Sequence, residues 1–310
     1  MSDFDRLEDL EMQTLDNSEV EMDAETELLS MVPDQELMVS TDIVSSKDNS
    51  GKPLRVLTIG DFHCGHEVGL TPPEWNPALG TDDSMHIYRA TMWDYFAGAV
   101  NALRPIDILI ANGDLIDGRG EKSGSIELIT SDRLVQAKIA RDIIKFVDAP
   151  AVYITRGTDY HVGAFESFED VIAEAVNVRR IGDVMNIEIN GVVFNVRHHV
   201  GGSQTPLGRA TPALREMVWN ELWSIRQNFP SADVILRSHV HYTIAVQTPT
   251  MLAMTLPGLQ GYGTRYGERR LSGEIHNGIT MFTVGVDGKY TWDQVIFPFP
   301  LPATSVESSI

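Results

Sequence analysis

From residue 54 onward, short apolar runs alternate with longer segments in which apolar residues recur at helical spacing. A short apolar run that ends in turn residues predicts a buried strand, and an apolar period near 3.6 predicts a helix. This alternation predicts an α/β core. Strands are expected at residues 54–60, 106–114, 151–157, 191–199 and 232–241, and helices at residues 85–103, 131–147, 166–178 and 211–229.

The last part of the chain has a different pattern. Residues 242–257 and 278–297 read mostly as strands, and residues 286–290 carry a hairpin signal. These strands would complete the sheet of the α/β core or add another.

In the helix expected at residues 131–147, Ser131 is the expected N-cap, because its hydroxyl could accept a hydrogen bond from the first turn.

The first 52 residues differ from the rest in composition. The first 50 contain 15 acidic and two basic residues. Such a segment buries too little apolar surface to offset the entropy of ordering. We therefore expect an acidic, disordered tail over residues 1–52, one domain over residues 53–303 and a C-terminal tail over residues 304–310. As an alternative for the acidic tail, three leucines could form one face of a helix that docks a protein partner: Leu7, Leu10 and Leu15.

Charge and cysteine content narrow the class of protein. The formal net charge of −20 argues against a global basic face for nucleic acid. Beyond the first 50 residues the chain holds 29 acidic and 22 basic residues, which leaves room for a local basic groove. The single cysteine, Cys64, fits a reducing compartment and is expected to be a buried thiol. The sequence has no secretory-signal pattern and no apolar run of ~18 residues, so we expect a soluble, cytoplasmic protein without membrane contact.

Polar side chains that bind metals follow five predicted strands where each strand ends. Six of the nine histidines lie in these segments. Ligands of open α/β sheets bind at the carboxyl ends of strands. Carboxylates and imidazoles without a thiolate suit manganese, iron or zinc better than a structural zinc cage. The candidates are Asp61 and His63, Asp114 and Asp117, Asp159 and His161, His198 and His199, and His239 and His241.

The spacing within these segments gives a further expectation. Residues two apart in an extended strand point to the same face. The members of the D-x-H pair at residues 61–63 and of the H-x-H pair at residues 239–241 are therefore expected to share a face. The same alternation favours His198 over His199 as a ligand, because it puts His198 on the side of the apolar Phe194.

The order of these motifs resembles that of the calcineurin-like metallophosphoesterases. In this chain they read DFH, GDLID, RGTDYHVG, RHH and SHVH, and the resemblance spans roughly residues 54–300. Two segments, DFHCGHEVGLTPPEW and RGTDYHVG, resemble a branch met in phage and prophage genomes. The resemblance implies an α/β, metallophosphoesterase-like sandwich of two mixed β-sheets flanked by helices.

The resemblance also implies two divalent metal ions, with manganese favoured and zinc, iron or nickel as alternatives. Asp114 would bridge the two ions. Asp117 would orient a ligating imidazole, or it is an ordinary turn residue, and His199 would contact substrate. The implied ligands are Asp61, His63 and His241 for the first metal, with Asp61 as a further bridging candidate, and His198 and His239 for the second.

The third motif departs from the family pattern. Thr158 stands where the family has a metal-binding Asn, and Asp159 stands where it has a His that assists the leaving group. Three interpretations stay open. Asp159 replaces the Asn as ligand while His161 donates the proton, or the second metal binds weakly and arrives with substrate, or the site is degenerate.

Two arginines complete the set of candidate residues. Arg209 and Arg265 lie in glycine-rich segments and are candidates for contact with a phosphate, with ordinary surface loops as the alternative. The sequence thus predicts a metal-dependent phosphoesterase that hydrolyses a phosphomono- or diester by in-line attack of a dimetal-activated water. Its substrate would be a phosphoester such as DNA or a nucleotide, as in a phage-type nuclease. The alternative is a degenerate, non-catalytic metal-binding scaffold or assembly protein.

Overall fold

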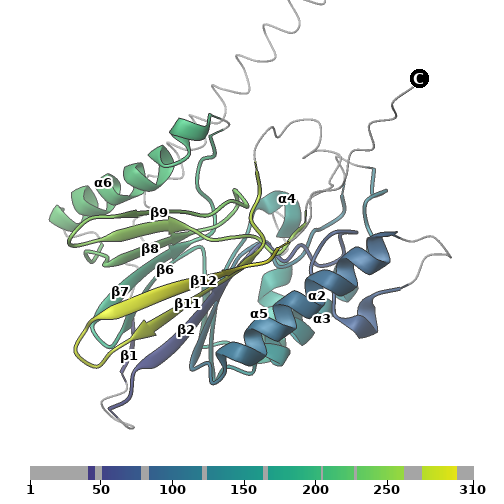
Figure 1. The fold of residues 1–310 in the computed structure, drawn as a ribbon, viewed down its shortest axis with the longest axis horizontal. Helices are drawn as coiled ribbons and strands as arrows, with labels where there is room; N and C mark the ends of the chain where they lie inside the picture. Colours follow the sequence, from purple (N-terminus) through teal and green to yellow (C-terminus); the bar gives the residue numbers. More distant parts are fainter. Residues whose placement is uncertain are drawn as a thin grey trace, which may run out of the picture. The chain divides into compact units, whose positions relative to one another are not determined.

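The computed structural model contains two six-stranded β-sheets that pack face to face (Figure 1). It describes residues 41–45, 51–77, 84–120, 124–162, 167–203, 205–226, 229–261 and 274–298. The first sheet has the spatial order β1-β6-β7-β8-β10-β9. Its strands are β1 (Thr41–Val44), β6 (Val184–Ile189), β7 (Val192–Arg197), β8 (Val234–Arg237), β10 (Leu252–Thr255) and β9 (Ile244–Gln247).

The second sheet has the spatial order β12-β11-β2-β3-β4-β5. Neighbouring strands β2, β3, β4 and β5 run parallel, whereas β11 runs antiparallel to both β2 and β12. The first sheet is also mixed, because β7 is parallel to β8 but antiparallel to β6. The predicted fold class is therefore confirmed. The strands of the second sheet are β12 (Tyr290–Ile296), β11 (Gly278–Val284), β2 (Leu54–Ile59), β3 (Ile108–Asn112), β4 (Ala151–Thr155) and β5 (Arg180–Gly182).

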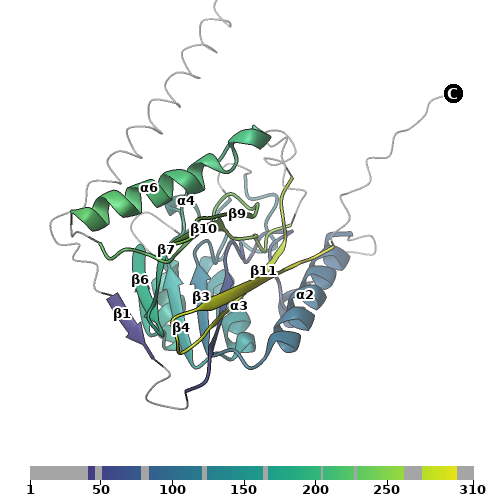
Figure 2. The same cartoon turned by 60° about the vertical axis from the view of Figure 1, so that its left-hand side comes forward.

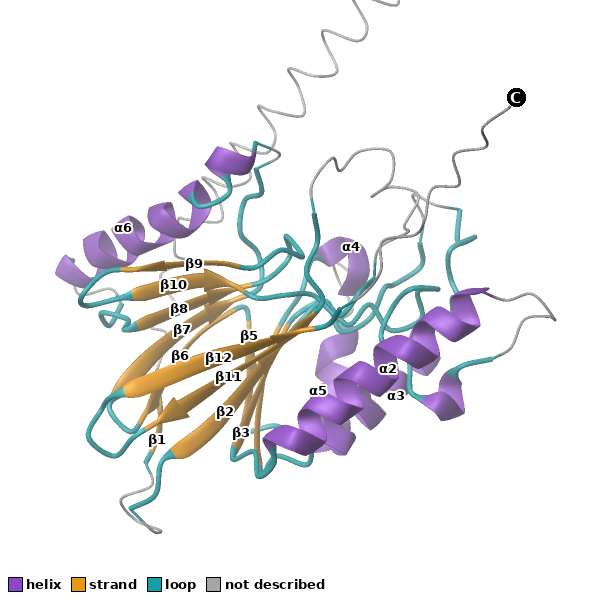
Figure 3. Ribbon diagram, viewed as in Figure 1, coloured by secondary structure: helices purple, strands orange, loops and turns teal. Residues whose placement is uncertain are grey.

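Helices cover the outer faces of both sheets (Figures 2 and 3). Apolar residues of α2 (Ser84–Leu103), α3 (Arg133–Val147) and α5 (Phe168–Val176) pack on β2, β3 and β4 in one continuous core. The first sheet carries α6 (Thr211–Ile225), which packs on β8 and β10. Between the sheets lies a second core, in which Phe194 of β7 meets Phe282 of β11 with ring centroids 5.3 Å apart.

The buried strands explain why the sequence pattern was readable. All five residues of β3 are buried, as expected of a parallel strand covered on both faces.

The N-cap of α3 is Asp132 and not Ser131, which corrects the expectation. The Asp132 carboxylate accepts hydrogen bonds from the backbone nitrogens of Leu134 and Val135. The shorter helices are η1 (Pro73–Trp75), α4 (Asp159–Val162) and η3 (Pro206–Gly208).

Strand β1 lies inside the segment predicted to be a disordered tail, so that expectation is wrong for these four residues. It pairs in parallel with β6, and Asp42 accepts a hydrogen bond from the Tyr153 hydroxyl at 2.7 Å. The pairing needs a partner strand, β6, that the sequence pattern also missed. The three leucines of the proposed docking helix and the C-terminal tail at residues 304–310 lie outside the described residues. None of the helices in the described part of the chain is long and apolar enough to cross a membrane.

Candidate metal centre

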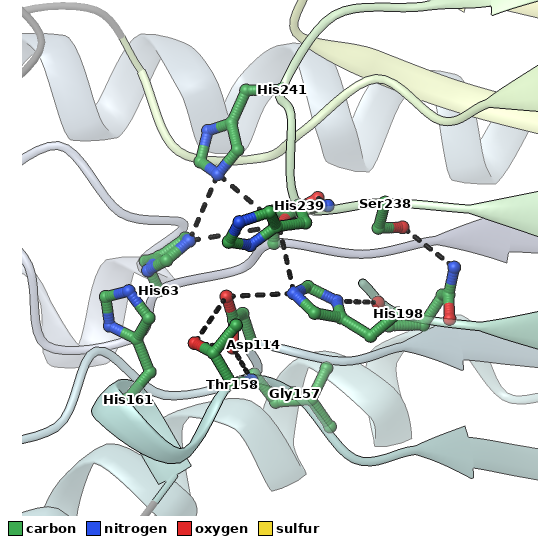
Figure 4. A network of polar contacts seen from close by, with 12 residues as sticks. His63, Asp114, Gly157, Thr158, His161, His198, Ser238, His239 and His241 are labelled. Carbon is green, nitrogen blue, oxygen red and sulfur yellow. Dashed lines mark hydrogen bonds and ion pairs between the residues drawn. The ribbon is translucent and has the colours of Figure 1, made fainter. Parts of the chain in front are cut away.

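The predicted ligands lie in the loops at the carboxyl ends of five strands that belong to both sheets. Strands β2, β3 and β4 of the second sheet and β7 and β8 of the first sheet each lead into one of these loops. Because β2, β3 and β4 are parallel to one another, and β7 is parallel to β8, their carboxyl ends gather the loops at one edge. Figure 4 shows the side chains brought together there.

The backbone of this edge is unusual. Nine described non-glycine residues have a positive φ, and five of them are predicted metal ligands. Positive φ is uncommon outside glycine and marks a tight change of chain direction. The five ligands are Asp61 (φ 53°), His63 (φ 45°), Asp114 (φ 50°), His239 (φ 72°) and His241 (φ 52°).

These left-handed turns correct the expectation that each D-x-H or H-x-H pair shares one face of an extended strand. Strand β2 ends at Ile59 and β8 ends at Arg237, so both pairs lie beyond the strands. The pairs still converge, but the local turns bring them together and the β alternation does not. Strand β7 also ends before His198, although His198 is buried and His199 is exposed, as the alternation predicted.

Asp61, His63 and His241 form one cluster, which we call the Asp61 group. Their ligand atoms lie within 4.8 Å of one another. His241 Nε2 is 3.3 Å from both His63 Nε2 and Asp61 Oδ1. The opposite nitrogen of His63, Nδ1, is 3.0 Å from Asp117 Oδ1. Asp117 therefore contacts a candidate ligand as expected of a residue that orients an imidazole.

Asp114, His198 and His239 form a second cluster, the Asp114 group, with the same 4.8 Å limit between ligand atoms. His198 Nε2 is 3.0 Å from Asp114 Oδ2, and His198 Nδ1 is 2.8 Å from the carbonyl oxygen of Asn112. The two groups are adjacent, since Asp61 Oδ1 is 3.9 Å from His198 Nε2. A third cluster contains His63, Asp114 and His161.

The imidazole orientations fit metal ligands. In His198, the Asn112 carbonyl oxygen holds the proton on Nδ1, and this turns Nε2 toward Asp114. His198 Nε2 is buried and has its ion-pair contact with Asp114 Oδ2. In His63, Asp117 likewise accepts from Nδ1, which turns Nε2 toward His241. Each arrangement aims a ring nitrogen at a site lined by carboxylate oxygen and nitrogen, which is the donor set that divalent metals take.

The electrostatics of the two groups are alike. Burial alone would raise the pKa of Asp61, but the charge of His241 lowers it below its ordinary value. Burial is likewise outweighed at Asp114, where His198 lowers the carboxyl pKa well below its usual range. Burial would lower the pKa of His198, yet Asp114 and Asp61 raise it to about 10. Burial is also outweighed at His241, whose pKa Asp61 raises above its ordinary value, so in each group a carboxylate favours the protonated form of one histidine.

The remaining histidine of each group has the opposite shift. Burial and the neighbouring charge of His161 lower the pKa of His63 to about 4. Burial and the charge of His198 lower the pKa of His239 to about 3. At neutral pH both rings are uncharged, and an uncharged imidazole is the form that binds a metal.

The divergent third motif begins directly after β4. Thr158 donates to Asp114 Oδ1 twice, from its backbone nitrogen at 2.7 Å and from its hydroxyl, which is 3.1 Å from Oδ1 and 3.3 Å from Oδ2. Asp159 is exposed at the start of α4 and belongs to none of the three clusters. His161, two residues further, lies in the third cluster, and its ring centroid is 4.5 Å from that of His63. The structure thus brings His161 to the centre and leaves Asp159 outside it.

The predicted substrate-contacting residues have different surroundings. His199 is exposed, with its ring centroid 4.6 Å from that of His239. Arg209 donates to the carbonyl oxygen of Glu274 and lies over the ring of Tyr242. Arg265 lies outside the described residues. The buried position expected for the Cys64 thiol is confirmed.

Asn112 is a supporting residue whose role the sequence analysis missed. Its carbonyl holds His198, and its side-chain amide donates to the Ser238 hydroxyl at 2.9 Å, which connects the two sheets beside the centre. The next residue, Gly113, has a φ of +72°, and a Cβ there would lie 2.5 Å from the His198 ring. A polar residue at the end of an otherwise apolar strand was the available signal for Asn112.

Solved structures with a similar fold include three that each match most of this chain. An archaeal phosphodiesterase matches 79% of this chain and 100% of its own, with 13% identity and a TM-score of 0.42. Vacuolar protein sorting 29 from Cryptosporidium parvum matches 79% of this chain and 98% of its own, with 15% identity and a TM-score of 0.43. Wild-type Vps29 from Entamoeba histolytica, solved in complex with Zn²⁺, matches 78% of this chain and 99% of its own, with 15% identity and a TM-score of 0.39.

No model of a known protein family matches the chain, and no curated protein matches it either. The identities and TM-scores of the solved structures are too low to transfer an activity. The functional argument therefore rests on the residues of this chain.

Proposed function

We propose that the chain is a metal-dependent phosphoesterase of the calcineurin-like metallophosphoesterase superfamily. The observation that carries the proposal is the pair of adjacent Asp/His groups at the joined strand ends, each with ring nitrogens turned toward carboxylate oxygens. Such an oxygen- and nitrogen-rich donor set without sulfur suits manganese, with zinc, iron and nickel as alternatives.

Both groups have the residues needed to hold a metal ion. Asp61, His63 and His241 would hold one ion, and His198 and His239 the other, with Asp114 shared between them. Two bound ions would lower the pKa of a water and stabilise the charge that develops on a phosphoryl group. The carboxylates of Asp61 and Asp114, which are ionised at neutral pH, supply the negative charge that attracts the ions.

His161 is the proposed proton donor to the leaving oxygen. Its Nδ1 is 2.9 Å from the carbonyl oxygen of Asp117, so the opposite nitrogen is free to face a substrate. The side chain is 19% exposed, similar to the 17% of His241, and a ligand can therefore reach it, whereas His63 and His198 are buried. Asp159 has no part in this proposal, because it is exposed and lies outside the clusters.

The proposed substrate is a phosphomonoester or phosphodiester. DNA and nucleotides are the candidate substrates, and the enzyme would then be a phage-type nuclease. Metal analysis of the purified protein, coupled to hydrolysis of mono- and diesters and of single- and double-stranded DNA in Mn²⁺, tests this directly. We expect hydrolysis that EDTA abolishes and Mn²⁺ restores. Bound metal without hydrolysis of any phosphoester would overturn the enzymatic proposal.

One observation favours a second function, a non-catalytic metal-binding scaffold. The backbone nitrogen and the hydroxyl of Thr158 both donate to Asp114. The loop after β4 therefore provides hydrogen-bond donors at the position where a catalytic site would use a further metal ligand. A scaffold would bind one metal ion or none and would leave a generic aryl phosphodiester intact. The same metal analysis and assay therefore separate the two functions.

A further inference from the structure

Glu169 is a fully buried carboxylate beneath the candidate metal centre, and the proposed chemistry does not use it. It lies near the start of α5, and its side chain reaches the loops that follow β3 and β4. Oε1 accepts a hydrogen bond from the backbone nitrogen of Leu115 at 3.1 Å, and Oε2 accepts one from the backbone nitrogen of Gly157 at 2.7 Å. One carboxylate thus connects two loops that are 42 residues apart in the sequence.

The two backbone donors flank the residues that matter most for the Asp114 group. Leu115 directly follows Asp114, and Gly157 directly precedes Thr158. At Gly157 the two loops are in close approach, since a Cβ there would lie 2.2 Å from Asp114 Oδ1 and 2.3 Å from the Asp114 backbone nitrogen. Only a residue without a side chain fits this approach, so the relative position of the loops is tightly constrained.

The position of the loops decides which oxygen of Asp114 is left for a metal ion. Thr158 donates to Oδ1 from its backbone nitrogen, while Oδ2 lies 3.0 Å from His198 Nε2. A shift of either loop would misalign the Thr158 donors and let the Asp114 carboxylate rotate. Metal sites depend on such outer contacts to hold a ligand in the orientation that binds.

A buried carboxyl group in this place has an energetic cost when it ionises. Burial raises the pKa of Glu169 to about 8, against the backbone hydrogen bonds, which lower it. Among the described residues no Lys or Arg forms an ion pair with it. An apolar side chain would fill the same space without this cost but would leave two backbone donors unpaired.

We propose that Glu169 is a positioning residue that joins the β3 and β4 loops and thereby holds Asp114 in its metal-binding orientation. The consequence for metal binding rests on the proposed function. The consequence for the contact between Asp114 and Thr158 does not, because that contact exists without metal.

The test compares Glu169→Gln with Glu174→Gln, a matched control at an exposed position of the same helix. Glutamine keeps the volume but has one acceptor oxygen, so its amide group would face one of the two backbone donors. In the metal-free protein, we expect the Thr158 amide resonance to shift in Glu169→Gln and to stay in place in Glu174→Gln. In titrations with Mn²⁺ alone, the dissociation constant should rise roughly 10- to 100-fold in Glu169→Gln only.

Glu169→Asp provides a second variant in case the glutamine variant does not fold. Its side chain keeps both acceptor oxygens but is one methylene shorter, so the oxygens lie farther from the two backbone donors. We expect the Thr158 amide resonance to shift and the Mn²⁺ dissociation constant to rise, both by less than in Glu169→Gln. Reduced thermal stability with an unmoved Thr158 amide and unchanged Mn²⁺ affinity would overturn the proposal, since a purely structural role gives that result. If the wild-type chain binds no Mn²⁺, the proposed function fails, and the Thr158 amide alone decides the role of Glu169.

Discussion

The Asp61 group and the Asp114 group contain the same residue types, one aspartate and two histidines, but their neighbours differ. In the Asp61 group, a carboxylate, Asp117, holds the outer nitrogen of His63. In the Asp114 group, a neutral backbone carbonyl, that of Asn112, holds the outer nitrogen of His198. A carboxylate makes an imidazole a stronger ligand than a carbonyl does. We therefore expect the Asp61 group to bind a metal ion more tightly.

The largest expected effect comes from Asp114→Asn, because Asp114 belongs to two of the three clusters. The substitution removes one partner of a buried ion pair with His198, at a cost of about 3–5 kcal/mol. We expect metal content and phosphodiester hydrolysis to fall together, as measured by metal analysis and a diesterase assay. Asp159→Asn, at an exposed position nearby, is the control. Full metal content in Asp114→Asn would show that the two groups do not share this ligand.

Replacing His161 by Ala tests whether the third cluster donates a proton or binds metal. As a proton donor, His161 contributes roughly 10²–10⁴-fold to the rate. We expect turnover to fall by that factor while metal content stays at the wild-type level. Unchanged turnover would rule out the proton-donor role, and a loss of metal would make His161 a ligand.

Asp117→Asn sharpens the comparison between the groups. It keeps the shape of the side chain but replaces the charged partner of His63 by a neutral one. Loss of such a partner weakens metal binding roughly 10- to 100-fold. In a Mn²⁺ titration we expect the tighter of the two binding phases to weaken and the other to stay unchanged. If the weaker phase moves instead, the order of affinity proposed for the two groups is reversed.

The stability of the metal-free protein should depend on pH through both groups. The pKa of His63 is lowered to about 4 and that of His239 to about 3, from 6.5. The unfolded chain takes up these protons first, so the stabilisation present above pH 6.5 is lost as the pH falls. Each such histidine costs about 1.4 kcal/mol per pH unit. Urea unfolding in EDTA at pH 6.5 and 5.5 measures this loss, which should be smaller in His239→Gln.

The opposite shift acts on the alkaline side. The pKa of His198 is raised to about 10, so its contribution is complete below pH 6.5 and is lost as the pH rises toward 10. Unfolding curves at pH 7 and 9 should therefore show a second decline that His198→Gln reduces. A flat profile between pH 7 and 9 in the wild-type protein would contradict the ion pair between His198 and Asp114.

The smallest effect is expected for Thr158→Val, which removes one of the two donors to Asp114. The backbone nitrogen of Thr158 still donates at 2.7 Å, so only the hydroxyl contribution of about 0.5–1.5 kcal/mol is lost. We expect the weaker Mn²⁺ phase to weaken by no more than about tenfold, and Thr158→Ser to behave as wild type. Equal weakening of both phases would mean that Thr158 supports the whole centre and not the Asp114 group alone.

Strand β6 shows where the sequence pattern failed for the fold. Its residues 184–189 read VMNIEI, and two polar residues interrupt the apolar run. One of them, Asn186, is fully buried and accepts a hydrogen bond from the Asn195 amide on the neighbouring strand at 2.8 Å. A buried polar residue depends on hydrogen-bond partners from other parts of the chain, so the local pattern does not reveal its burial. Without β6, the pairing of β1 could not be predicted either.

The sequence by itself determined the α/β fold and the candidate ligand set. Polar residues that directly follow a buried apolar run stand out in the sequence, so local pattern alone finds Asp61, Asp114 and His239. The tertiary structure decided how these residues meet. Left-handed turns aim them at one place, Asp159 faces outward, and Glu169 pairs with two loops far from it in the chain. These outcomes depend on contacts between distant segments, which no local pattern encodes.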